Sequence, residues 1–109
     1  MNKLHKLEKK LERCLNSGAK RIRFIYLFKT ENNMYKIGVA ANPHKRLKGV
    51  QTGCPTLVEH VYSLKTFRAL NVEAIIHEVF NKNRVIGEWF KFSSSEVQNV
   101  IGEIQRRVV

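Results

Sequence analysis

Hydrophobic residues recur along this chain with two different periods, and these periods predict its elements. Leucines in residues 4–15 are spaced by three and four positions, with lysines between them, which is typical of an amphipathic helix. Residues 23–29 and 34–40 are instead rich in aromatic and branched side chains, and the polar residues 31–33 separate them. Two such runs around a turn predict a β-hairpin.

Residues that cap helices divide the rest of the chain. Asn42 and Pro43 supply an N-cap and a first-turn proline for a short helix that Gly53 ends. Ser93 and Glu96 have the spacing of a capping box and predict the start of a terminal helix.

Three further segments complete the predicted fold. Residues 57–64 alternate well enough for a third strand, 68–81 form the longest predicted helix of the domain, and 87–92 form a short extended segment. The order predicts an α/β (α+β) fold, a small three-stranded and largely antiparallel sheet flanked by helices. We expect a basic amphipathic helix over residues 1–20 and one domain over residues 21–109.

The chain is strongly basic, and the charge is concentrated in its first half. Its 109 residues carry 20 Lys and Arg against nine Glu, with a net charge of +11 and a sequence pI near 10.1. Residues 1–54 have a net charge of +10 and residues 55–109 a net charge of +1. Such a field attracts polyanions, so we favour nucleic acid as the partner over solubility alone or an anionic membrane surface.

Sequence features also predict where the protein resides. No apolar run approaches the roughly 20 residues that span a bilayer, and residues 1–15 do not resemble a signal peptide. We expect no membrane association and an intracellular location, in the cytoplasm or nucleus, and in a host cell if the chain is viral. Cys14 and Cys54 have no CxxC partner, which favours reduced thiols and argues against a structural zinc site.

The N-terminal helix has three possible roles. Its leucines pack on its own domain, which we prefer, pair with a second copy to form a homodimer, or stay unpacked until DNA binds. Its lysines are candidate DNA contacts, namely Lys3, Lys6, Lys9 and Lys10.

Glu73 is the sharpest local anomaly, because its neighbours at helical spacing are mostly apolar. A buried carboxylate needs a metal ion, an arginine or a water-filled cleft. A structural salt bridge to Arg46 or Arg84 is an equally good interpretation of this residue alone. His77, one turn later, is either a second metal ligand or a core histidine.

Arg46 lies in the first turn of its predicted helix, where both the helix N-terminus and the guanidinium favour an anion. His44, Lys45 and Lys48 lie beside it and are candidate nucleic-acid contacts. Tyr26 lies in the middle of a predicted strand, where core tyrosines are common, so its type alone does not mark a site.

The joint spacing of these residues resembles a known family. The matching groups are Phe24-Ile25-Tyr26, Lys36-Ile37-Gly38, Arg46-Leu47, Gln51-Thr52-Gly53, Glu73 with His77, and Gly87-Glu88-Trp89-Phe90. The pattern resembles the GIY-YIG nuclease superfamily, in particular a viral and phage branch whose second motif is Lys-Ile-Gly and whose domain ends in Gly-Glu-Trp-Phe. The resemblance implies a three-stranded core that cuts nucleic acid with one divalent metal ion.

The resemblance also implies roles for individual residues. Tyr26 matches the tyrosine that orients or deprotonates the attacking water, Arg46 the arginine that binds the scissile phosphate, and Glu73 the one protein ligand of the metal. Mg²⁺ or Mn²⁺ is the implied cofactor, and DNA is preferred to RNA as the substrate.

Two positions in the motifs that name the family depart from its pattern, as do Val50, where relatives often have His or Tyr, and the Glu88-Trp89 region, which replaces the usual downstream Asn. Phe24 replaces the first glycine, and Lys36 replaces the second tyrosine and becomes a candidate ligand of the phosphate or the nucleophile. Tyr35 precedes Lys36 and is a candidate nucleic-acid contact, although strand alternation puts these two residues on opposite faces. We interpret Glu88 as a possible aid to the metal and Trp89 as a core residue rather than a platform for a base.

The leading hypothesis is a metal-dependent DNA endonuclease that hydrolyses phosphodiester bonds. The alternative is a catalytically inactive nucleic-acid-binding module on the same fold, in which the altered second motif has lost cleavage. A third hypothesis is a protein-interaction domain whose charge serves solubility.

Overall fold

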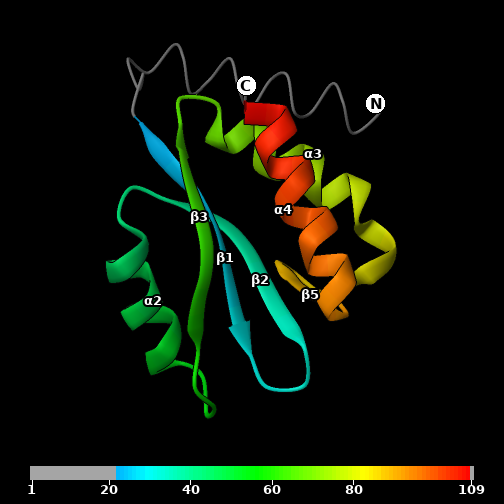
Figure 1. Cartoon of the computed structure of the whole chain (residues 1–109). Coiled ribbons are helices and arrows are strands. Elements are labelled where there is room, and N and C mark those ends of the chain that lie inside the picture. Colours follow the sequence, from blue (N-terminus) through cyan, green and yellow to red (C-terminus); the bar gives the residue numbers. More distant parts are fainter. Residues whose placement is uncertain (1–21, 109) are drawn as a thin grey trace.

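The computed structural model describes residues 22–108, which form a small α+β fold (Figure 1). The predicted helix over residues 1–20 and its lysines lie outside the described residues. The elements, labelled as in Figure 1, are β1 (Arg23–Thr30), β2 (Met34–Ala40), α2 (Pro43–Thr52), β3 (Glu59–Thr66), α3 (Ala69–Val79), a 3-10 turn (Asn81–Asn83), β4 (Arg84–Ile86), β5 (Trp89–Lys91) and α4 (Ser94–Val108).

The sheet of the described region has five strands in the order β3-β1-β2-β5-β4, and every pairing is antiparallel. The prediction of three strands was therefore wrong. Strands β4 and β5 have only three residues each, too few for an alternating pattern to stand out in the sequence. Gly87, with φ of +55°, allows the tight turn between them. Strand β5 then extends the sheet at the edge of β2.

The sheet has a different covering on each face (Figure 1). Helices α3 and α4 cover one face, where Ile25, Leu27 and Ile37 are fully buried together with apolar residues of both helices. Helix α2 covers the other face, where Tyr26 and Phe28 pack with partly buried residues of α2. Alternation along β1 thus divides its side chains between two separate apolar clusters.

Helix α2 begins and ends where the sequence predicts. The side chain of Asn42 accepts a hydrogen bond from Lys45 N–H (3.2 Å), Pro43 is the first helical residue, and Gly53 is the C-cap.

The loop after α2 delays the third strand by two residues relative to its prediction. The Gln51 side chain donates to the carbonyl of Thr56 (2.9 Å) and accepts from Val58 N–H (2.7 Å). These bonds hold the loop in an irregular conformation, so β3 begins at Glu59.

A reciprocal capping box starts α4, as the sequence predicts. Ser93 Oγ accepts from Glu96 N–H (3.2 Å), and the Glu96 carboxylate accepts from Ser93 N–H (2.9 Å). The same carboxylate accepts from Asn83 Nδ2 (2.9 Å). The bond from the Ser93 backbone is the main reason that the pKa of Glu96 lies below its ordinary value.

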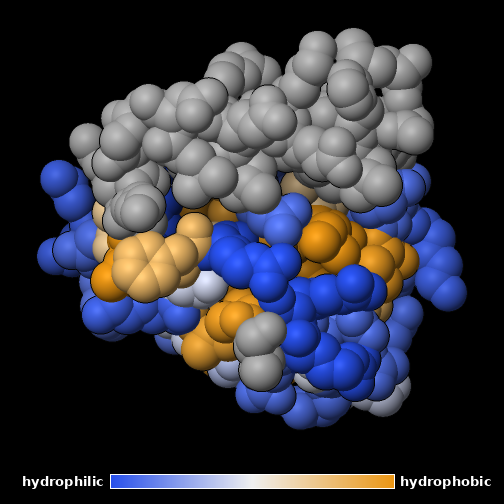
Figure 2. All heavy atoms as spheres, turned by 90° about the horizontal axis from the view of Figure 1, so that it is seen from above, coloured by the Kyte–Doolittle hydropathy of each residue, from blue (hydrophilic) through white to orange (hydrophobic). Residues whose placement is uncertain are grey.

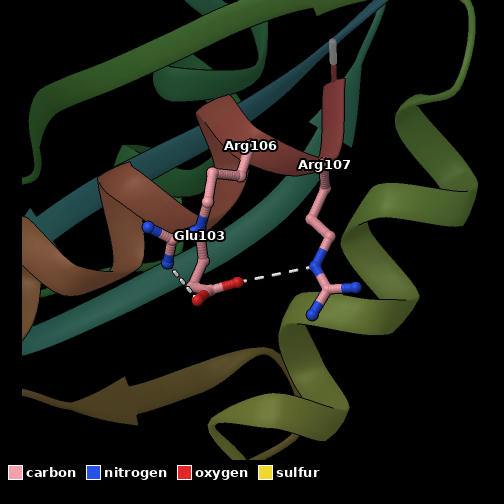
Figure 3. Close-up of polar contacts among 3 residues, drawn as sticks. All are labelled: Glu103, Arg106 and Arg107. Carbon is pink, nitrogen blue, oxygen red and sulfur yellow. Dashed lines mark hydrogen bonds and ion pairs between the residues drawn. The ribbon is translucent and has the colours of Figure 1, made fainter.

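The other end of α4 carries a small ion-pair cluster (Figure 3). Glu103 bonds to Arg106 one turn later and lies 3.4 Å from Nε of Arg107. The hydrogen bond from Arg106 is the main cause that lowers the pKa of Glu103. Both arginines therefore share a carboxylate, which offsets part of their charge.

The outer surface mixes apolar and hydrophilic side chains. On the face seen in Figure 2, apolar patches lie between strongly hydrophilic ones, as is ordinary for a folded domain. Within residues 22–108, no helix combines the length and the apolar character that crossing a bilayer requires.

Replacing the N-cap of α4 should destabilise the domain. Ser93→Ala removes the acceptor of Glu96 N–H and should lower the free energy of unfolding by about 1 kcal/mol, measured by urea denaturation. Ser94→Ala, at the first exposed position of the same helix, is the matched control and should leave the midpoint nearly unchanged. Equal effects of the two substitutions would show that the capping box does not stabilise α4.

Candidate functional site

The pairing of β1 with β2 places Tyr26 directly opposite Gly38. The phenol lies over this glycine so closely that a Cβ atom at position 38 would clash with Tyr26 Oη. Tyr26 is fully buried, and its ring stacks on Phe28 with ring centroids 4.0 Å apart. The absence of a side chain at Gly38 thus leaves the space that the Tyr26 phenol occupies.

Strand β5 leaves part of the β2 edge unpaired, and the candidate site lies there. Regular pairing of β5 with β2 stops at Lys36 opposite Trp89. Beyond that point Ile37 N–H donates to the carbonyl of Glu88 (3.1 Å), and His77 Nε2–H donates to the carbonyl of Ile37 (2.8 Å). The backbone of Ile37 therefore fixes the β4–β5 turn on one side and a side chain of α3 on the other.

Three possible metal ligands meet at this edge. Glu73, His77 and Glu88 each offer a ligand atom, and these atoms lie within 4.8 Å of one another. Glu73 is 7% exposed, as the apolar neighbours in its sequence suggest. His77 Nε2–H donates to a backbone carbonyl, and metal-binding histidines usually make such a bond with one of their ring nitrogens.

Lys36 joins this cluster through Glu88. Its Nζ lies 2.9 Å from Glu88 Oε1, and the two side chains are 16% and 38% exposed. The same Nζ lies 5.5 Å from the centre of the Trp89 ring. The ammonium therefore offsets negative charge where two carboxylates are close together.

Charged groups of the β4–β5 turn, of α2 and of α3 act on the Tyr26 phenol. The pKa of Tyr26 is raised from 10.0 to about 12, mainly by burial and next by the charge of Glu88, while the Arg46 guanidinium lowers it. Glu73 also raises this pKa. The phenol oxygen has no hydrogen-bond partner of ordinary geometry among residues 22–108, so Arg46 acts on it mainly through its charge. Tyr26 is a neutral phenol at pH 7.

The remaining predicted contacts are divided between the surface and the core. His44, Lys45 and Lys48 are exposed on α2, and the His44 ring stacks near that of His60 with centroids 6.1 Å apart. Tyr35 is only 4% exposed and packs against Phe92 on the face covered by α3 and α4. The expectation that Tyr35 and Lys36 face opposite ways is confirmed, and the burial of Tyr35 removes it from the nucleic-acid contacts.

Trp89 is not the core residue that its sequence context suggested. It is half-buried and lines an open groove of about 540 Å³ between α2 and the β4–β5 hairpin. Phe90 fills the core position instead, because neighbouring residues of a strand point to opposite faces. The Gly-Glu-Trp-Phe segment contained this signal, but two adjacent aromatic residues do not reveal which of them faces the core.

The fold and the β2 edge define a small α+β domain in which acidic, imidazole and phenol groups meet beside a basic helix. Over residues 23–105 the chain matches the T5orf172 domain, and it therefore belongs to that family. This domain is phage-associated and of the nuclease type, and the family is associated with endonuclease-like function. No curated protein and no solved structure matched the chain.

Adding a methyl group at position 38 should displace the Tyr26 phenol. Gly38→Ala places its Cβ against Tyr26 Oη, and such overpacking costs about 1–3 kcal/mol. Urea denaturation should show this loss, and the double variant with Tyr26→Phe, which removes the crowded oxygen, should regain part of it. An unchanged unfolding midpoint in Gly38→Ala would contradict the close packing.

Titration of Tyr26 should be visible at alkaline pH. The difference in phenolate absorbance between the wild type and Tyr26→Phe should have its midpoint at about pH 12 rather than 10. The folded state keeps this proton more tightly than the unfolded state, so this group's contribution to stability is lost as pH rises from about 10 to about 12. Tyr26→Phe should reduce that loss, and a midpoint near pH 10 would mean that the phenol is not desolvated.

Proposed function

We propose that this protein is a metal-dependent endonuclease of the GIY-YIG type that hydrolyses phosphodiester bonds in DNA. The observation that supports it best is the meeting of Glu73, His77 and Glu88 at the β2 edge, with the charges of Glu73, Glu88 and Arg46 all acting on the Tyr26 phenol. Membership in the T5orf172 domain family supports the same class of activity.

Arg46 is the proposed ligand of the scissile phosphate. It lies near the N-terminus of α2, an end that attracts anions, and is exposed. Its guanidinium can bind two phosphate oxygens at once and stabilise charge that develops during cleavage.

Tyr26 is proposed to orient the attacking water. Because its pKa lies at about 12, the residue is a phenol at pH 7 and acts through hydrogen bonding rather than as a preformed base. Burial of the ring and contact with Gly38 hold the oxygen in one place, which is what such positioning requires.

The donor groups at the β2 edge fit a divalent cation. Carboxylates suit Mg²⁺ and Mn²⁺, and the buried Glu73 offers its carboxylate within 4.8 Å of ligand atoms of His77 and Glu88. Glu73 would hold the ion, with His77 and Glu88 as additional ligands. The ion would stabilise negative charge on the phosphate and the leaving oxygen.

Lys36 replaces the second tyrosine of the family motif, and its role is proposed from its contacts. Its ammonium pairs with Glu88 and is largely shielded from solvent, so it balances the carboxylates and can also attract a phosphate. The second candidate function, an inactive nucleic-acid-binding module, rests on this same substitution.

Cleavage should require both a divalent ion and Glu73. Supercoiled plasmid incubated with the protein and Mg²⁺ or Mn²⁺ should be nicked or linearised, and EDTA should prevent it. Glu73→Gln should slow cleavage by about 100-fold or more, because the ion contributes several kcal/mol to the transition state. DNA binding, measured by mobility shift in EDTA, should be nearly unchanged.

Glu78→Gln is the matched control, since Glu78 is an exposed glutamate of the same helix. It should retain cleavage. Activity that persists in EDTA or in Glu73→Gln would contradict the proposed metal ligand. Binding with no cleavage under any of these conditions would favour the inactive module.

A further inference from the structure

The groove beside Trp89 takes no part in the proposed cleavage chemistry, yet it adjoins the site. It has a volume of about 540 Å³, within the range of sites for small organic groups. Gly49 and Val50 of α2 line one side, and Ile86 and Trp89 of the hairpin line the other. Lys36 lines it as well, so the groove and the charged cluster share a residue.

Strand pairing explains why the side of the groove formed by the β4–β5 hairpin is apolar and aromatic. Trp89 pairs with Lys36 across β2 and β5, and Ile86 pairs with Trp89 across β4 and β5. Paired residues point to the same face of a sheet, so all three lie on the face that carries Tyr26. Ile86 is 71% exposed, which leaves apolar surface at the rim of the groove.

We propose that this groove binds an unpaired nucleobase of the DNA, stacked on Trp89, next to the phosphate at Arg46. The proposal rests on the proposed nuclease function and adds the class of substrate. Aromatic rings bind bases of any sequence through their faces. Lys36 Nζ lies over one face of the Trp89 ring, 5.5 Å from its centre, so the base would stack on the other face. Lys45 and Lys48 are exposed on α2, the helix that forms the opposite wall, and add positive charge there.

Gly49 contributes to the width of the groove. A Cβ atom at this position would meet nothing within 4 Å, so the missing side chain leaves space rather than relieving a clash. A glycine inside a helix is destabilising by roughly 0.5–1 kcal/mol relative to alanine. Filling this position should therefore close the groove without unfolding α2.

Binding of an unpaired base in the groove would determine which DNA structures the protein prefers. A base inside a regular duplex is stacked on both sides and cannot reach Trp89 unless it is extruded, which costs a few kcal/mol. Bulged, gapped, flapped or single-stranded DNA avoids that cost. The proposed substrates are therefore DNAs with an unpaired base beside the cut.

Intrinsic fluorescence provides a direct test, because Trp89 is the single tryptophan of the chain. The protein in EDTA is titrated with a duplex that carries one bulged adenine, with the same duplex carrying an abasic bulge, and with a fully paired duplex. The adenine duplex should quench the fluorescence, and the other two should not. Its affinity, measured by anisotropy of labelled DNA, should exceed that of the abasic duplex by about 5- to 100-fold.

Two variants locate the effect in the groove. Gly49→Leu should fill the groove and reduce the preference for the adenine bulge to nearly one. Gly102→Leu is the matched control, since a Cβ atom at this α4 position also meets nothing within 4 Å, and it should keep the preference. Trp89→Leu should lose the preference as well.

The outcomes separate this proposal from the proposed function. Equal quenching by the adenine and abasic bulges, or a preference that survives Gly49→Leu, overturns the base site whether or not the protein cuts DNA. Quenching specific to the unpaired base supports the groove even if plasmid cleavage fails, and that failure would then count against the nuclease alone.

Discussion

The register between β1 and β2 is the constraint on which the candidate site depends. It sets Tyr26 opposite Gly38, and the glycine leaves the space for the phenol. A slip of one residue would turn Tyr26 towards α3 and α4 and would bring an apolar neighbour to the α2 face. Gly38 and Tyr26 therefore act as a pair, because the absent side chain of the glycine leaves the space in which the tyrosine ring is buried.

Charge balance at the β2 edge follows from where β5 stops. If β5 continued its pairing past Lys36, the backbone of Ile37 would be covered by a strand and could not anchor both Glu88 and His77. The early end of pairing brings two carboxylates and an imidazole together, and such a cluster needs cations. Lys36 supplies one through its ion pair with Glu88.

Much of the fold followed from the sequence, and the failures have physical reasons. Capping residues such as Asn42 and Ser93 act through bonds to their own helix, so local sequence predicts them well. The three-residue strands β4 and β5 depend on pairing with β2, which no local pattern encodes. Tyr26, Arg46 and Glu73 were predicted through joint spacing, and the structure brings them into electrostatic contact. The pairing of Lys36 with Glu88 joins residues far apart in the chain, and no spacing rule contains it.

The lysine at the second motif is best understood from its two neighbours. A phenol at position 36 would offer Glu88 a hydrogen bond, whereas the ammonium offers a full charge, and it also lies near the face of the Trp89 ring. Lys36, which stands where the family motif has a tyrosine, therefore contacts both Glu88 of the site and the Trp89 ring of the groove. Because one side chain serves both places, any change of charge at Glu88 alters the cation that stands beside Trp89. Lys36 is thus the residue that the carboxylate cluster and the groove share.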